Sequence, residues 1–363
     1  MARIITIVFF LFSSFVVKAQ SIQKFLDSLM RTNQIPEIGY AIISPDSILE
    51  LKVLGFHRSD IQNEQTKATL TDYFHLGSNS KAITGFVAAY LVENNKIKWT
   101  TKFFDLFPEW LKGSNSAYAS ISLADLLSHR AHIQPYMSGL EYDELPEFKG
   151  NKSKQREQFA KYLLAEKPVD NNEKAYNYSN AGYSIAALML EKVSGKSWEQ
   201  LTKELMATKV KVNIEYGWPN KINLNQPYGH WIENDTLRPL PPSTDYNLSL
   251  AEPAGDICIT LPDYAKFVQL QLQGLSGRDN VLKTNTYNYL HYGLKGYAIG
   301  WGNMNKDGKK YSEHIGSAGT FFCQTLINKT DKLALIVTSN SASPQAQKAI
   351  LKFVNLLKNQ YGI

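Results

Sequence analysis

Cysteine is scarce in this sequence, and no group of residues has the composition of a metal site. Cys258 and Cys323 are the two cysteines among 363 residues, and each lies in an apolar stretch. They could form one disulfide in an exported chain, but two buried free thiols fit those neighbours at least as well. His129 and His132 have no cysteine or carboxylate set nearby, whereas zinc normally takes three or four protein ligands. We therefore expect no metal.

The sequence also lacks a dense basic cluster. Its formal net charge of +6 arises from 39 Lys and Arg and 33 Asp and Glu, which are scattered together along the chain. This pattern is typical of a solvated surface of mixed charge, and it argues against nucleic-acid binding.

A long apolar run is missing as well, except for a short one at the start. Arg3 precedes an uncharged apolar run, Ile4 to Val17, and the small residue Ala19 stands just before Gln20. This is the layout of a signal peptide, and the run is shorter than the roughly twenty residues that span a bilayer. We expect residues 1–19 to be a signal peptide, cleaved near Ala19 and Gln20. The mature protein would be periplasmic or secreted, with no membrane span.

Strand-like segments near both ends of the chain enclose a helical middle. Residues 35–44, 47–56, 319–329 and 331–340 have strand composition, and residues 21–33 and 343–360 have helical patterns. This order predicts an α/β protein of the α+β type, with an antiparallel sheet flanked by N- and C-terminal helices. We expect one domain over residues 20–363. Its α/β part comprises about 20–77 and 246–363, and a mostly helical region over about 78–245 is inserted into it.

A serine hydrolase needs a nucleophile, a base and donors for the oxyanion. The Gly-x-Ser-x-Gly turn of α/β-hydrolases is absent. Instead, Ser78 stands three residues before Lys81 at the start of an apolar helical pattern over about 78–95, so their side chains would share one face of the helix. Ser80 would be turned away from that face. The alternative interpretation of Ser78 is a helix N-cap.

Two later stretches accompany this motif. Tyr178 to Asn180 precede a second apolar helix, and His314 to Gly316 lie on the first of two apparently paired strands. Neither stretch is informative alone. Ser21 and Lys24 also form Ser-x-x-Lys, and His291 to Gly293 repeat the His-x-Gly pattern. What indicates a function is that the three stretches occur together and in this order.

In that order, "GSNSK", "YSN" and "HIGSAG" resemble the motifs of the β-lactamase-related serine hydrolases. This superfamily includes penicillin-binding proteins with DD-peptidase activity, class C β-lactamases, serine esterases and D-aminopeptidases. The resemblance extends over nearly the whole mature chain. It implies the fold of that superfamily and an acyl-enzyme mechanism.

The resemblance also implies roles for particular residues. Ser78 would be the acylated nucleophile, Lys81 its partner, and Tyr178 the base or proton shuttle. The backbone N–H groups of Ser78 and Ser317 would form the oxyanion hole. The implied substrate-binding residues are Asn180, His314 and Gly316. Lysine has a pKa near ~10.4, so Lys81 can be the base only if its pKa is lowered, and the sequence leaves open whether it or Tyr178 holds the proton.

Two departures from the family pattern concern the substrate. His314 stands where many relatives have a lysine, so a substrate carboxylate would meet a weaker and pH-dependent attraction. The loop "LLSHRAHI" lacks the usual glycine. Its residues His129, Arg130 and His132 would lie either near the cleft or on a surface loop.

The sequence as a whole predicts an exported serine hydrolase that acts on small esters or D-amino-acid-containing peptides. Its partner would be a small-molecule or peptide substrate, without nucleic acid, metal or organic cofactor. The alternatives are a class C-like β-lactamase and a penicillin-binding or sensor protein that acylates without efficient turnover. Acyl transfer to an amine or alcohol stays open as well.

Overall fold

The computed structural model describes residues 22–137, 139–170 and 176–363. The expected signal peptide over residues 1–19 lies outside the described residues.

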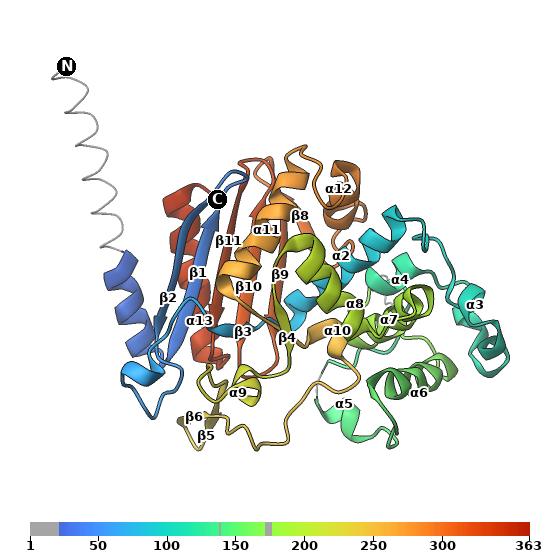
Figure 1. Cartoon of the computed structure of the whole chain (residues 1–363), viewed down its shortest axis with the longest axis horizontal. Helices are drawn as coiled ribbons and strands as arrows, with labels where there is room; N and C mark the ends of the chain where they lie inside the picture. Colours follow the sequence, from blue (N-terminus) through green and yellow to red (C-terminus); the bar gives the residue numbers. More distant parts are fainter. Residues whose placement is uncertain (1–21, 138, 171–175) are drawn as a thin grey trace.

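Six antiparallel strands form the main sheet, in the order β2-β1-β11-β10-β9-β8. Their bounds are β1 Glu37–Ile43, β2 Ile48–Gly55, β8 Gly302–Lys306, β9 Lys309–Ser317, β10 Phe322–Asn328 and β11 Leu333–Ser339. The N-terminal hairpin joins the C-terminal strands because β1 pairs with β11 along its whole length, with Ile38 opposite Ser339. The predicted antiparallel sheet is therefore confirmed, and both ends of the chain contribute to it (Figure 1).

Every residue of β1 is buried, so both faces of the sheet are covered. Side chains alternate between the faces of a strand. Ile38, Tyr40 and Ile42 pack into one hydrophobic cluster, whereas Ala41 and Ile43 belong to another on the opposite face.

The terminal helices cover the first face. They are a helix over residues 22–32 and α13, Pro344–Tyr361. The rings of Phe25 and Phe353, one from each helix, stack with centroids 6.3 Å apart. Ser343 is the N-cap of α13, and its hydroxyl accepts a hydrogen bond from Ala346 N. The predicted flanking helices are thus confirmed.

The other face packs against α11, Leu261–Leu275, and the helices between the two halves of the sheet (Figure 1). The central one is α2, Ser80–Glu93, in which nearly every side chain is buried, as expected of a helix that is apolar all round. The remaining helices are α3 Phe103–Leu106, α4 Leu123–Leu127, α5 Gly139–Asp143, α6 Lys152–Ala165, α7 Asn180–Ser194, α8 Trp198–Leu205, α9 Pro219–Ile222, α10 Glu252–Gly255 and α12 Thr284–Tyr292.

Two smaller sheets complete the described fold. One has the order β3-β7-β4 and the other is the hairpin β5-β6. Their strands are β3 Tyr73–His75, β4 Ile214–Tyr216, β5 His230–Glu233, β6 Thr236–Pro239 and β7 Ile257–Thr260. The region expected to be mostly helical therefore also contains three short strands. β3 leads into the turn Gly77–Asn79, which carries Ser78.

The two cysteines lie in different sheets, Cys258 on β7 and Cys323 on β10, and both are buried free thiols. Among the described residues, no helix combines the length and the apolar character needed to cross a bilayer.

Candidate active site

Ser78 lies in a short 3-10 turn, Gly77–Asn79, between β3 and α2. The α-helix begins at Ser80, two residues later than predicted. The N-cap of α2 is Asn79, and no side chain caps the helix. The hydroxyl of Ser78 is therefore free for other contacts, and the N-cap interpretation of this serine is wrong.

Lys81 lies beneath Ser78 and is completely buried. Its Nζ is 3.1 Å from Ser78 Oγ, 2.7 Å from Asn180 Oδ1 and 2.9 Å from the carbonyl oxygen of Ala254. The amide of Asn180 is held in this orientation because its Nδ2 donates to the Tyr136 carbonyl at 2.8 Å. Three of the predicted site residues thus meet around one amine.

Burial lowers the pKa of Lys81 well below its usual value near 10.5. No Asp or Glu accepts a hydrogen bond from its Nζ in the described part of the chain, so no carboxylate compensates for desolvation. A lowered pKa favours the neutral amine, which is the form that can accept a proton.

Tyr178 lies beside the same amine, with Lys81 Nζ 4.7 Å from the centre of its ring. Burial raises the pKa of its hydroxyl, and a hydrogen bond with Ser78 opposes that rise in part. The phenol is therefore neutral near pH 7 and carries a proton next to Ser78.

Two glycines bring β9 against the Ser78 turn. A methyl group built on Gly316 would lie 2.1 Å from the Leu76 carbonyl oxygen and 2.6 Å from Ser78 N. One built on Gly77, whose φ is +51°, would lie 2.5 Å from Ser317 N. Only glycine permits this approach. As a result, the backbone N–H groups of Ser78 and Ser317 come from two segments in direct contact.

His314 points into the protein and is only 5% exposed. Its Nε2 lies 2.9 Å from the Tyr297 hydroxyl and its Nδ1 lies 3.1 Å from the Ile315 carbonyl oxygen. Burial, followed by the nearby Lys81, lowers the pKa of His314 to about 3. The ring is therefore neutral throughout the physiological range, and the pH-dependent attraction expected of it has no support in this environment.

The loop before α5 brings a residue whose position the sequence left open. His129 is buried, and its ring lies 4.2 Å from the ring of Tyr178, centroid to centroid. Its carbonyl accepts from Asn177 N and its Nδ1 accepts from Ser179 N, so it holds the chain on both sides of Tyr178. Arg130 instead bonds the carbonyl groups of Lys295 and Tyr297.

The Ala254 carbonyl is a part of the site that sequence reasoning missed. It lies on α10, where the Pro253 carbonyl also accepts from the Thr84 hydroxyl of α2 at 2.7 Å. A backbone carbonyl group can come from any residue type, so no side chain in the sequence marks it.

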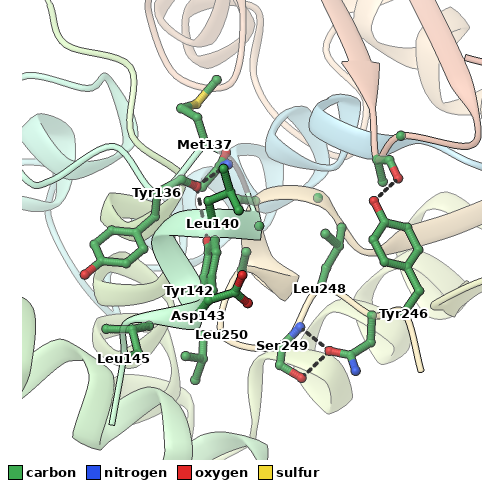
Figure 2. Close-up of a pocket in the computed structure, with 18 of the residues that line it drawn as sticks. Tyr136, Met137, Leu140, Tyr142, Asp143, Leu145, Tyr246, Leu248, Ser249 and Leu250 are labelled. Atoms are coloured by element: carbon green, nitrogen blue, oxygen red, sulfur yellow. Dashed lines mark hydrogen bonds between the residues drawn. The ribbon is translucent and has the colours of Figure 1, made fainter. Parts of the chain in front are cut away.

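Ser78 opens onto a pocket of about 900 Å³, which Figure 2 shows. Aromatic and aliphatic side chains form much of its wall, among them Tyr136, Tyr142 and Tyr246. The charged residues that line it are Asp143 and Asp245. Within the described part of the chain, no Lys, Arg or His lines this pocket.

A family model described as Beta-lactamase matches residues 22–358 of the chain. A relative, Protein flp of Staphylococcus aureus (strain N315), is 19% identical over 336 residues, which cover 91% of this chain and 65% of that protein. The chain therefore spans less than two thirds of the length of this relative.

Two solved structures share the fold. The octameric penicillin-binding protein homologue from Pyrococcus abyssi aligns with a TM-score of 0.74 at 18% identity, over 94% of this chain and 77% of the other. The D-alanine carboxypeptidase AmpC from Burkholderia cenocepacia aligns with a TM-score of 0.70 at 14% identity, over 93% and 98%. Both likenesses confirm the predicted fold class.

Proposed function

The chain belongs to the beta-lactamase family, as its three motifs predict, and on that premise we propose that it is an exported serine hydrolase. In this proposal it acts through an acyl-enzyme on small esters or D-amino-acid-containing peptides. Ser78, Lys81 and Tyr178 are its catalytic residues, and residues 20–363 work as a single domain after removal of the signal peptide.

One observation carries this proposal, namely the set of partners around Lys81 Nζ. A neutral amine has two N–H donors and one lone pair. Two of the three neighbours, Asn180 Oδ1 and the Ala254 carbonyl, can only accept, so they take the two N–H groups. The lone pair then faces Ser78 Oγ at 3.1 Å, a distance suited to proton abstraction.

The steps follow from this arrangement. Lys81 takes the Ser78 proton as Oγ forms a bond to the substrate carbonyl carbon, and the two backbone N–H groups stabilise the oxyanion. The neutral hydroxyl of Tyr178 donates its proton to the leaving group and regains one from protonated Lys81. A water molecule then attacks the acyl-enzyme and releases the acid.

The charged residues of the pocket favour a substrate without a free carboxylate. The charged groups that line it are Asp143 and Asp245, which repel an anion. β-Lactams and peptides with a free C-terminal carboxylate bring such an anion, whereas esters and amides with a neutral or cationic acyl part do not. The apolar wall offers a surface for that acyl part.

A hydrolysis panel tests this proposal. We expect 4-nitrophenyl butyrate to have a kcat/KM at least about tenfold above that of the 4-nitrophenyl hemisuccinate, because the two acyl groups differ mainly by a carboxylate. Asp143→Asn should lower the ratio of kcat/KM for the butyrate ester to kcat/KM for the hemisuccinate ester. A D-alanyl amide and a chromogenic cephalosporin complete the panel. Faster turnover of the cephalosporin than of every ester would favour a β-lactamase, and a persistent penicillin adduct without turnover would favour a sensor.

Replacing Lys81 by methionine should lower kcat/KM by about 10²–10³, because the general base is lost. The wild-type kcat/KM should rise with pH through an apparent pKa below 10.5. In Lys81→Met this rise of kcat/KM with pH should be absent. The measurement is a pH–rate profile of ester hydrolysis. Lys96→Met, which removes an exposed lysine after α2, is the matched control.

The same variant should change how stability depends on pH. Because burial lowers the pKa of Lys81 in the folded state, the unfolded chain binds more protons at neutral pH. The free energy of unfolding of the wild type therefore contains a part that rises with pH up to about 10.5, and Lys81→Met lacks this part. Urea unfolding of both proteins at several pH values measures the difference. An equal pH dependence would contradict a lowered pKa.

A further inference from the structure

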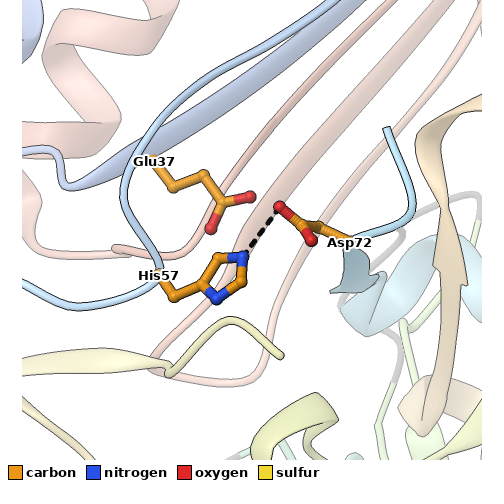
Figure 3. A group of neighbouring side chains, drawn as sticks. All are labelled: Glu37, His57 and Asp72. Carbon is orange, nitrogen blue, oxygen red and sulfur yellow. Dashed lines mark ion pairs between the residues drawn. The ribbon is translucent and has the colours of Figure 1, made fainter. Parts of the chain in front are cut away.

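Three buried ionisable side chains meet outside the Ser78 pocket. Glu37 is the first residue of β1, His57 follows β2, and Asp72 directly precedes β3. Their carboxylate oxygens and imidazole nitrogen lie within 4.8 Å of one another, and Figure 3 shows the three groups converging. The sequence predicted no metal site, because the members of this cluster lie in three separate segments.

The ligand-type atoms of this cluster lack the partners that buried polar atoms normally have. Glu37 is 0% exposed and Asp72 is 2% exposed. As ionised groups, both carboxylate oxygens of Glu37 and the Nε2 of His57 are buried and have no hydrogen-bond partner, although the Glu37 carboxyl lies close enough to Asp72 to share a proton with it. Native structures rarely leave such groups unsatisfied, so three in one place require an explanation.

The contact between His57 and Asp72 has an unusual geometry. His57 Nε2 lies 3.0 Å from Asp72 Oδ2, yet the two atoms are not aligned for a hydrogen bond. Two ligands of one metal ion have this arrangement, because each directs its lone pair at the ion between them. Asp72 is also fixed in place, since Thr69 N and Thr69 Oγ1 donate to its two oxygens at 2.6 and 2.8 Å.

The charge of the cluster also favours a bound cation. No Lys or Arg forms an ion pair with Glu37 or Asp72 in residues 22–137, 139–170 and 176–363. Two adjacent carboxylates are costly to bury, and a shared proton, a charged His57 paired with Asp72 or a bound cation can each remove that cost.

We propose that Glu37, His57 and Asp72 bind one divalent zinc ion. One imidazole nitrogen and two carboxylates are common zinc ligands, whereas Ca²⁺ and Mg²⁺ prefer sites of oxygen alone. Zinc–ligand distances of about 2.0–2.2 Å require ligand atoms about 3.4 Å apart, so the side chains need to close by little more than ~1 Å. Water would complete a tetrahedral site.

The position of the ion indicates a structural role. It would connect the β1–β2 hairpin of the main sheet to the segment that enters β3, and β3 ends just before the Ser78 turn. Binding energy at such a site is added to folding energy. The site does not depend on the proposed hydrolase function, and its test needs no substrate.

Zinc content and thermal stability of the full-length mature protein test the proposal. After dialysis against a chelator and reloading, we expect one zinc per chain by elemental analysis. Free Zn²⁺ about 100-fold above the dissociation constant should raise Tm by about 4 °C. Replacement by Co²⁺ should produce the visible absorption of a tetrahedral site. A protein that takes up no zinc and shows no Tm shift would overturn the proposal.

Isosteric variants locate the ion. Glu37→Gln and His57→Gln should each lose the zinc, the Tm shift and the Co²⁺ absorption. The control is His291→Gln, which alters a buried histidine whose two ring nitrogens contact Ser312 and Gln271 and face no carboxylate. Zinc that persists in the two cluster variants, or a Glu37→Gln protein that is more stable at every zinc concentration, would instead indicate a shared proton. If a variant fails to fold, the Co²⁺ spectrum of the wild type still decides.

Discussion

Ser78→Ala should reduce hydrolysis by on the order of 10⁴–10⁶ while leaving the free energy of unfolding nearly unchanged. The loss is large because, in the proposed mechanism, the Ser78 hydroxyl forms the acyl-enzyme. The fold should persist because the side chain is small and only half-buried, and because it caps no helix. The measurements are steady-state ester hydrolysis, mass spectrometry for an acyl adduct, and a urea titration.

Ser80→Ala is the matched control two residues away. Ser80 is fully buried, and its hydroxyl accepts a hydrogen bond from Ile257 N at 3.1 Å. Removing it should cost about 1–3 kcal/mol of stability by leaving that donor unpaired, with most of the activity retained in the folded protein. Ser78→Ala should therefore lose activity and keep its stability, whereas Ser80→Ala should lose stability and keep most of its activity. Full acylation of Ser78→Ala, or loss of acylation in folded Ser80→Ala, would refute the assignment.

Gly316→Ala should impair both the activity and the fold. The added methyl group would lie 2.1 Å from the Leu76 carbonyl oxygen, so β9 and the Ser78 turn must move apart. Overpacking against backbone should cost about 3 kcal/mol. It should also separate the two backbone donors of the oxyanion hole. Because loss of one donor of the proposed oxyanion hole costs about 10²–10³ in rate, activity per folded molecule should fall by about that factor.

Gly302→Ala, on the neighbouring strand β8, is the control that shows whether any glycine-to-alanine change in this part of the sheet lowers stability and activity. A methyl group there meets nothing closer than 3.4 Å, so stability and activity should stay near wild type. Ser317→Ala is a second control, because its backbone N–H remains. Folded fraction by circular dichroism and kcat/KM per folded molecule are the measurements. Wild-type activity in Gly316→Ala would exclude close contact between the two segments.

The motifs of the candidate site were predictable because they are local in sequence. Three-residue spacing predicted that Ser78 and Lys81 would meet, and the structure brings Asn180 to the same amine. The exact start of α2 was not predictable. It depends on contacts between Gly77 and β9, which lies more than 230 residues away along the chain.

The residues that sequence reasoning missed or left open share one property: their positions are decided by contacts with segments that are distant in the sequence. His129 looked like part of a connecting loop, yet it is buried against Tyr178. His314 was predicted to face substrate, but both of its ring nitrogens have partners inside the protein. Alternation along β9 explains the inward direction of His314, because Ile315 and Ser317 take the exposed positions.

The pairing of β1 with β11 has a consequence for how the chain folds. These strands are adjacent in the sheet, although Ile38 and its partner Ser339 are about 300 positions apart in the sequence. Such non-local pairing requires closure of a very long loop, and proteins rich in it fold slowly. β1 therefore has no partner on that side until β11, Leu333–Ser339, has left the ribosome. Until then the chain remains open, with its apolar strand edges exposed to chaperones and proteases.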